Sequence, residues 1–154
     1  MRNSLRILTL CVIAAFLSSC AYVEYRRIYD IQPRLSAEQR VAVGDVIERY
    51  FSYKGYNLKQ KYHDYEPDDA YVTVFQIPRS AEQKVRELYI YILVKKTGVV
   101  QLKHLEWFFE DSLFTESKNK PQDLIASVKS DLVIEIKKNV GVTVDIQLSD
   151  KGYY

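Results

Sequence analysis

The chain has 154 residues, long enough for one domain with a hydrophobic core. Its 22 Lys and Arg residues nearly balance 20 Asp and Glu residues, so it lacks the basic footprint of a nucleic-acid-binding protein. Its only cysteines are Cys11 and Cys20, so nothing after Cys20 offers a thiol for disulfides, thiolate catalysis or cysteine–metal sites.

Residues 1–19 have the features of an export signal. Arg2 and Arg6 form a positive start, and an apolar run from Ile7 to Leu17 follows, interrupted only by Thr9. This run is too short to cross about 30 Å of hydrocarbon, which takes about 20 apolar residues. A cleaved signal peptide is therefore favoured over a transmembrane helix.

The sequence Leu17-Ser18-Ser19-Cys20 directly follows the apolar run. It resembles the lipobox of bacterial lipoproteins. The resemblance implies cleavage before Cys20, a diacylglycerol on its thiol and an acyl chain such as palmitate on its new amino group. Two or more chains hold a protein stably on a membrane, whereas one holds it only marginally. The alternatives are an ordinary secreted protein and an uncleaved membrane anchor.

The resemblance also predicts a location in the cell envelope. Ala21 follows the cysteine in place of the Asp that commonly retains lipoproteins of this family in the inner membrane. The outer membrane is therefore favoured in a Gram-negative host, with the domain facing the periplasm. Loss of Arg2 and Arg6 with the signal leaves 20 basic against 20 acidic residues, so the mature chain is neutral.

Residues 20–35 are predicted to be a lipidated N-terminus and tether, and residues 36–154 a single domain. Between Tyr22 and Ile31 the tether has no Gly or Ser and is rich in Tyr and β-branched residues. This composition predicts that part of it docks on the domain as an edge strand.

The first helix is predicted to start at Ser36. Ser36 and Gln39 have the spacing of a capping box, in which each side chain bonds the other residue's backbone N–H. Lys54-Gly55 supplies a helix end. Apolar residues recur at three and four positions and predict one buried face: Val43, Val46, Ile47, Tyr50 and Phe51.

Two strands are expected next, at 57–65 and 71–77, on either side of an acidic turn. Four carboxylates fall within residues 64–69 and raise the possibility of a calcium site. The EF-hand spacing, its glycine and its distal Glu are all missing. The sequence therefore predicts a solvated acidic turn and no metal site.

Residues 80–86 are predicted to form a helical turn and residues 87–96 a strand, with one continuous helix as the alternative. Three residues ending at Gly98 should then form a hairpin loop with Gly98 left-handed. That loop length sets Val94 opposite Val100 and Ile92 opposite Leu102, which gives one coherent apolar face.

The return strand is expected to end near Phe109, followed by a loop at 109–120. Pro121 at the first helical position and Asp123 in the first turn predict a second helix, which Gly141 ends. Alternating apolar residues then predict a half-buried strand over 142–148.

The overall prediction is an α+β fold, with two helices packed on one face of an antiparallel sheet of about four to five strands. The only histidines, His63 and His104, have no metal-ligand spacing and no obvious Asp or Glu neighbour to orient them. Both are interpreted as ordinary sheet or surface residues, with His104 opposite Ile90. The chain is predicted not to be an enzyme and to hold no cofactor.

A partner-binding surface is predicted from the aromatic residues around the end of the return strand: Trp107, Phe109, Leu113 and Phe114. Exposed aromatic residues are typical interface anchors. The alternative is that Phe109, Leu113 and Phe114 fold back as a lid over the sheet edge.

The leading functional hypothesis is a non-catalytic, lipid-anchored accessory subunit of an envelope assembly, secretion or transport machine. Such a protein would contact the membrane through the lipid on Cys20 and bind an envelope protein. A carrier of small apolar ligands and a cell-wall hydrolase are the alternatives.

Overall fold

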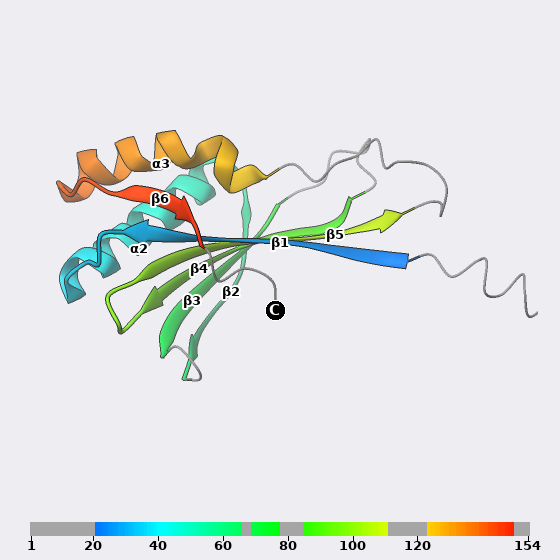
Figure 1. The fold of residues 1–154 in the computed structure, drawn as a ribbon, viewed down its shortest axis with the longest axis horizontal. Coiled ribbons are helices and arrows are strands. Elements are labelled where there is room, and N and C mark those ends of the chain that lie inside the picture. Colours follow the sequence, from blue (N-terminus) through cyan, green and yellow to red (C-terminus); the bar gives the residue numbers. More distant parts are fainter. Residues whose placement is uncertain (1–20, 66–68, 78–84, 111–122, 150–154) are drawn as a thin grey trace, which may run out of the picture.

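The computed structural model describes residues 21–65, 69–77, 85–110 and 123–149. Within these residues the fold is α+β, with two helices and one antiparallel sheet (Figure 1). The sheet has six strands in the order β2-β3-β4-β5-β1-β6, which corrects the predicted four to five. The elements are β1 Ala21–Gln32, α2 Ala37–Tyr53, β2 Asn57–Asp64, β3 Ala70–Gln76, β4 Val85–Lys95, β5 Val100–Glu110, α3 Leu124–Val140 and β6 Asp145–Leu148.

Strand β1 is formed by the segment that the sequence assigned to a tether. It pairs with β5 along its length, from Ala21 opposite Glu110 to Ile31 opposite Val100. It also pairs with β6, but only between Tyr29 and Gln32, so that end of β1 is interior to the sheet. Residues 21–28 pair with β5 alone, as in the predicted edge strand. Residues 21–32 therefore belong to the folded domain, because this Tyr-rich and β-branched segment pairs with β5 along almost its whole length.

Helix α2 has the predicted boundaries, and its predicted face is buried except at Tyr50, which is only partly buried. Ser36 Oγ accepts the Gln39 N–H at 3.2 Å and the Gln39 side chain accepts the Ser36 N–H at 3.1 Å, which completes the capping box. Phe51 is fully buried on the predicted face. Gly44 lies in close contact with strand β4, since a Cβ built there would stand 2.7 Å from Val94 Cγ2.

The β4–β5 hairpin has the predicted register. Val94 lies opposite Val100, Ile92 opposite Leu102 and Ile90 opposite His104. Gly98 has a φ of +89°, the left-handed conformation that its place in the loop requires. The alternative of one continuous helix over residues 80–96 is therefore wrong, and β4 already includes residues 85 and 86; residues 80–84 lie outside the described part of the chain.

Helix α3 starts later than predicted. Asp123 is its N-cap and not a first-turn residue, because its carboxylate accepts the Ala126 N–H at 3.1 Å. Pro121 lies outside the described residues. The helix ends as expected at Gly141, which has a φ of +78°.

Strand β6 is shorter than predicted and covers only Asp145–Leu148. Val144 and Ile146 are buried, but Leu148 is 54% exposed, which the predicted half-buried strand did not anticipate. The strand has one neighbour, β1, and pairing there stops at Tyr29 opposite Leu148. The strands β2 and β3 agree with the predicted positions to within one residue at each end.

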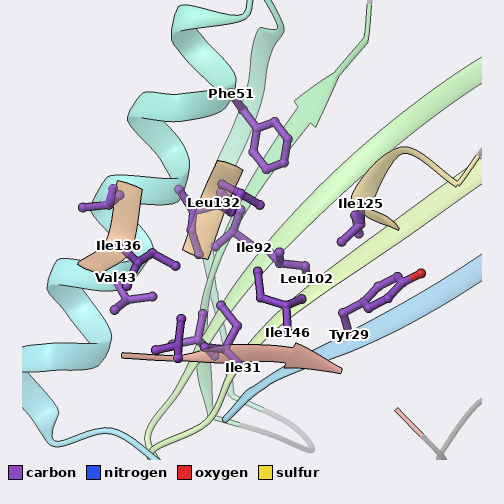
Figure 2. Close-up of a cluster of buried hydrophobic side chains, with 14 of the residues drawn as sticks. Tyr29, Ile31, Val43, Phe51, Ile92, Leu102, Ile125, Leu132, Ile136 and Ile146 are labelled. Carbon is purple, nitrogen blue, oxygen red and sulfur yellow. The ribbon is translucent and has the colours of Figure 1, made fainter. Parts of the chain in front are cut away.

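The main core lies between the helices and one face of the sheet, here called the helix face (Figure 2). The two helices pack on each other and lie over only part of this face, so that the Ala21 end of β1 extends beyond them (Figure 1). The core residues labelled in Figure 2 come from four strands and both helices: Tyr29, Ile31, Val43, Phe51, Ile92, Leu102, Ile125, Leu132, Ile136 and Ile146. Alternate residues of the same strands point to the opposite face, here called the open face.

Candidate functional site

The structure describes only some of the predicted partner-binding residues. Trp107 lies on β5, on the open face and away from the helices. The backbone of Phe109 belongs to β5, opposite Tyr22, but its side chain is not described. Cys20, Leu113 and Phe114 lie outside the described residues, so their predicted roles remain predictions.

Trp107 contacts both strands that flank β5. Its indole Nε1–H donates a hydrogen bond to Glu24 Oε2 on β1 at 3.1 Å. Its ring meets the Tyr89 ring on β4 edge to face, with the ring centroids 6.0 Å apart. These contacts lock the orientation of Trp107 while leaving it half-buried.

Tyr91 continues the line of rings begun by Trp107 and Tyr89. Its ring centroid lies 6.4 Å from that of Tyr89, and the ammonium of Lys103 stands 5.4 Å from it. That distance is within the range of a cation–π interaction. We call Trp107, Tyr89, Tyr91 and Lys103 the Trp107 face.

The Trp107 face adjoins a small apolar cluster on strand β3. Ala70, Val72 and Val74 on β3 are buried on this side of the sheet, although both helices lie on the other. Tyr89 and Tyr91 on the neighbouring strand β4 pack against this cluster. The two tyrosines are therefore held from one side by packed apolar neighbours on the same face of the sheet.

Partial burial shifts the pKa values of two groups on the Trp107 face. Burial lowers the pKa of Lys103, assisted by the nearby Arg26 guanidinium. Burial also raises the pKa of Tyr91. Arg26 is bonded to Glu24 at 2.5 Å, so charges of both signs lie beside the rings.

This arrangement is suited to reversible, non-covalent binding. Amphipathic rings bury a large apolar area at a small cost in side-chain entropy, and the mixed charges at their edges can select a partner. Tyr89, Tyr91 and Lys103 were not among the partner-binding residues predicted from the sequence. Their spacing of two residues along β4, combined with the predicted hairpin register, is the signal that could have found them.

A second polar cluster lies on the helix face, around His104. The ring is fully buried, with Nε2 3.5 Å from Glu106 Oε2 and Nδ1 3.8 Å from Asp123 Oδ1. Tyr25 packs edge-on against it, and Tyr29 donates a hydrogen bond to Asp123. The expectation that no carboxylate lies near this histidine is therefore wrong; Glu106 was visible two residues away, but Asp123 required the tertiary fold.

The His104 cluster lacks the access that catalysis needs. Neither ring nitrogen makes a hydrogen bond among the described residues, and the Glu106 side chain is nearly as buried as the ring. A general base must reach a substrate within hydrogen-bond distance. Because the imidazole is enclosed on all sides, the geometry favours a packing role.

His63 also has a carboxylate partner that the sequence did not reveal. Its Nε2 lies 2.8 Å from Asp69 Oδ1, and Lys96 Nζ lies 2.6 Å from the other oxygen of Asp69. The Lys96 hydrogen bond is the main cause that lowers the pKa of Asp69. Among the described residues, no group of three or more potential ligands could hold a metal ion.

An open groove of about 500 Å³ lies between α2 and α3. Tyr50, Tyr53 and Ile134 line it together with charged side chains of both signs. It differs from the site that the carrier hypothesis requires, which is an apolar pocket between the helices and the sheet. That space is occupied by fully buried side chains such as Phe51 and Leu102.

No family model matches the chain, and comparisons with curated proteins and with solved structures found no match either. Neither helix in the described part of the chain is long and apolar enough to cross a membrane. Function is therefore inferred from the residues and their arrangement alone.

Proposed function

We propose that this protein is a lipid-anchored, non-catalytic lipoprotein of the bacterial cell envelope that binds a protein partner through its Trp107 face. The row of packed rings on a sheet face that neither helix covers is the observation that carries the binding role. Tyr and Trp are enriched at protein interfaces and among their hot spots.

The membrane anchor is supported by Leu17-Ser18-Ser19-Cys20 and the apolar run before it. In this proposal Cys20 carries the lipid and the domain faces the periplasm from the outer membrane. The biological role is that of an accessory subunit in an envelope assembly, secretion or transport machine.

The two alternative functions have less structural support. A carrier of small apolar ligands needs a cavity where Phe51, Leu102 and Leu132 instead fill the core. For a cell-wall hydrolase, His104 and Glu106 are too enclosed to reach a substrate, and the carboxylate of the more accessible His63–Asp69 pair is bonded to Lys96.

Lipidation is tested by intact-mass spectrometry of the mature protein from membranes. The wild type should lack residues 1–19 and carry the mass of three acyl chains, and Cys20→Ala should carry none and leave the membrane fraction. An unmodified wild-type N-terminus would refute the anchor.

The binding role is tested by in-cell cross-linking followed by purification from detergent-solubilised envelopes. Trp107→Ala should reduce the yield of cross-linked partner by tenfold or so, as hot-spot truncations do. Tyr53→Ala is the matched control, because Tyr53 is an aromatic residue 90% exposed on α2, away from the Trp107 face. Equal loss in both variants, or loss explained by unfolding in near-UV circular dichroism, would contradict the proposal.

A further inference from the structure

Strand β1 begins at the residue that follows the lipobox cysteine. Ala21 pairs with Glu110, and the next two residues pair with Phe109 and Phe108. Consecutive Cα atoms are 3.8 Å apart, so Cys20 lies within one residue of the hydrogen-bonded sheet. A lipid on Cys20 would therefore be joined directly to the domain, without a flexible tether.

Distances from the anchor along the β1–β5 ladder follow from the rise of a strand, about 3.3 Å per residue. Trp107 lies opposite Glu24, the fourth residue after Cys20, which corresponds to about 13 Å. Lys103 lies opposite Ile28, at about 26 Å. The β4–β5 hairpin lies beyond Ile31, at about 36 Å or more.

We propose that the Ala21 end of the sheet docks on the headgroup layer of the anchoring membrane. Strand β1 then runs from the membrane surface outwards, with its Ala21 end nearest the headgroups. This inference rests on the proposed lipidation of Cys20. The docking partner is a phospholipid surface, because no linker residues separate the lipidated Cys20 from the first residue of strand β1. The Trp107 face is then held side-on, about 13–26 Å from the anchor along the strand.

An upright domain is favoured over one that lies flat on its open face. That face presents charges of both signs beside its rings, the carboxylates of Glu24 and Glu87 and the cations of Arg26 and Lys103. Pressing them into the low-dielectric interface would cost solvation energy. Standing upright keeps them in water and leaves the Trp107 face open sideways, towards proteins in or on the same membrane.

The unique Trp107 makes the placement measurable, because the chain contains one tryptophan. The lipidated full-length protein is placed in vesicles of phosphatidylethanolamine and phosphatidylglycerol that carry dansyl-labelled headgroups. Energy transfer from Trp107 to dansyl then reports its distance from the headgroups. A linker of 15 Gly and Ser residues, preceded by one Ala, is inserted between Cys20 and Ala21 in a second variant.

The linker has a mean span of about 21 Å and should lower the transfer efficiency at least twofold. A third variant combines Trp107→Phe with Thr97→Trp and moves the reporter to the exposed hairpin turn at the far end of the sheet. Its transfer efficiency should be less than half that of Trp107. Intact mass and near-UV circular dichroism verify that each variant is lipidated and folded.

The outcomes separate this inference from the proposed function. Equal transfer with and without the linker would overturn direct docking, although lipidation itself would stand. Equal or greater transfer from the Thr97 position would overturn the upright placement. Absence of the lipid mass in the wild type would refute the proposed function, and the docking inference with it.

Discussion

Trp107 and Glu24 face each other across the β1–β5 ladder, where the indole N–H donates to the Glu24 carboxylate at 3.1 Å. This hydrogen bond is the main cause that lowers the pKa of Glu24, and Arg26 contributes further. The bond connects the first strand of the domain to the proposed partner-binding face.

Trp107 emission should therefore change with pH through the protonation of Glu24. Because the folded-state pKa of Glu24 is lowered, its stabilising contribution is present above the pKa of the unfolded state and is lost as pH falls through the folded value. We expect an emission change with a midpoint below the ordinary glutamate range. Glu24→Gln should abolish this transition, and its persistence in that variant would assign it to another group.

Gly98→Ala should destabilise the protein more than Gly55→Ala does. Both glycines have a positive φ, which costs other residues about 1 kcal/mol or more. A Cβ at Gly98 would also stand 3.0 Å from the Leu35 carbonyl oxygen, whereas nothing lies within 4 Å at Gly55. Urea denaturation measures both variants, and equal losses would mean that the Leu35 contact contributes nothing.

Gly44→Ala should destabilise the protein, against the ordinary helix preference. Alanine gains about 1 kcal/mol over glycine within a helix. Here its Cβ would meet Val94 Cγ2 at 2.7 Å, and overpacking typically costs about 1–3 kcal/mol. In a double-mutant cycle with Val94→Ala, the penalty should shrink because the obstructing methyl group is gone. A Gly44→Ala variant more stable than the wild type would show that Val94 moves aside freely.

Tyr50→Phe should cost about 1 kcal/mol at neutral pH, because the Tyr50 hydroxyl donates to Asp131 Oδ2 at 3.2 Å and links α2 to α3. Burial and this bond raise the pKa of Tyr50 to about 12. The contribution should thus be complete below the usual tyrosine pKa and lost as pH rises towards 12. Tyr53→Phe, on the exposed side of the same helix, should change stability neither at neutral pH nor as the pH rises towards 12.

Local patterns determined much of the fold. The Ser36–Gln39 spacing predicted the start of α2, because a capping box depends on residues three positions apart. Gly98 and the alternation of apolar residues predicted the hairpin register, because a shift by one residue would turn every side chain to the wrong face. The start of α3 was predicted less accurately from Asp123, since an Asp suits both the N-cap and the first turn.

Tertiary structure alone decided the position of β1 and the composition of the Trp107 face. Strand β1 pairs with segments about 70 to 120 residues away along the chain, from Gln101 opposite Asp30 to Leu148 opposite Tyr29. The sequence of a segment predicts that it can form a strand, but not which other strand it will pair with. The bond from Trp107 to Glu24 and the approach of Asp123 to His104 depend on that choice, because each joins residues that only the assembled sheet and helix α3 bring together.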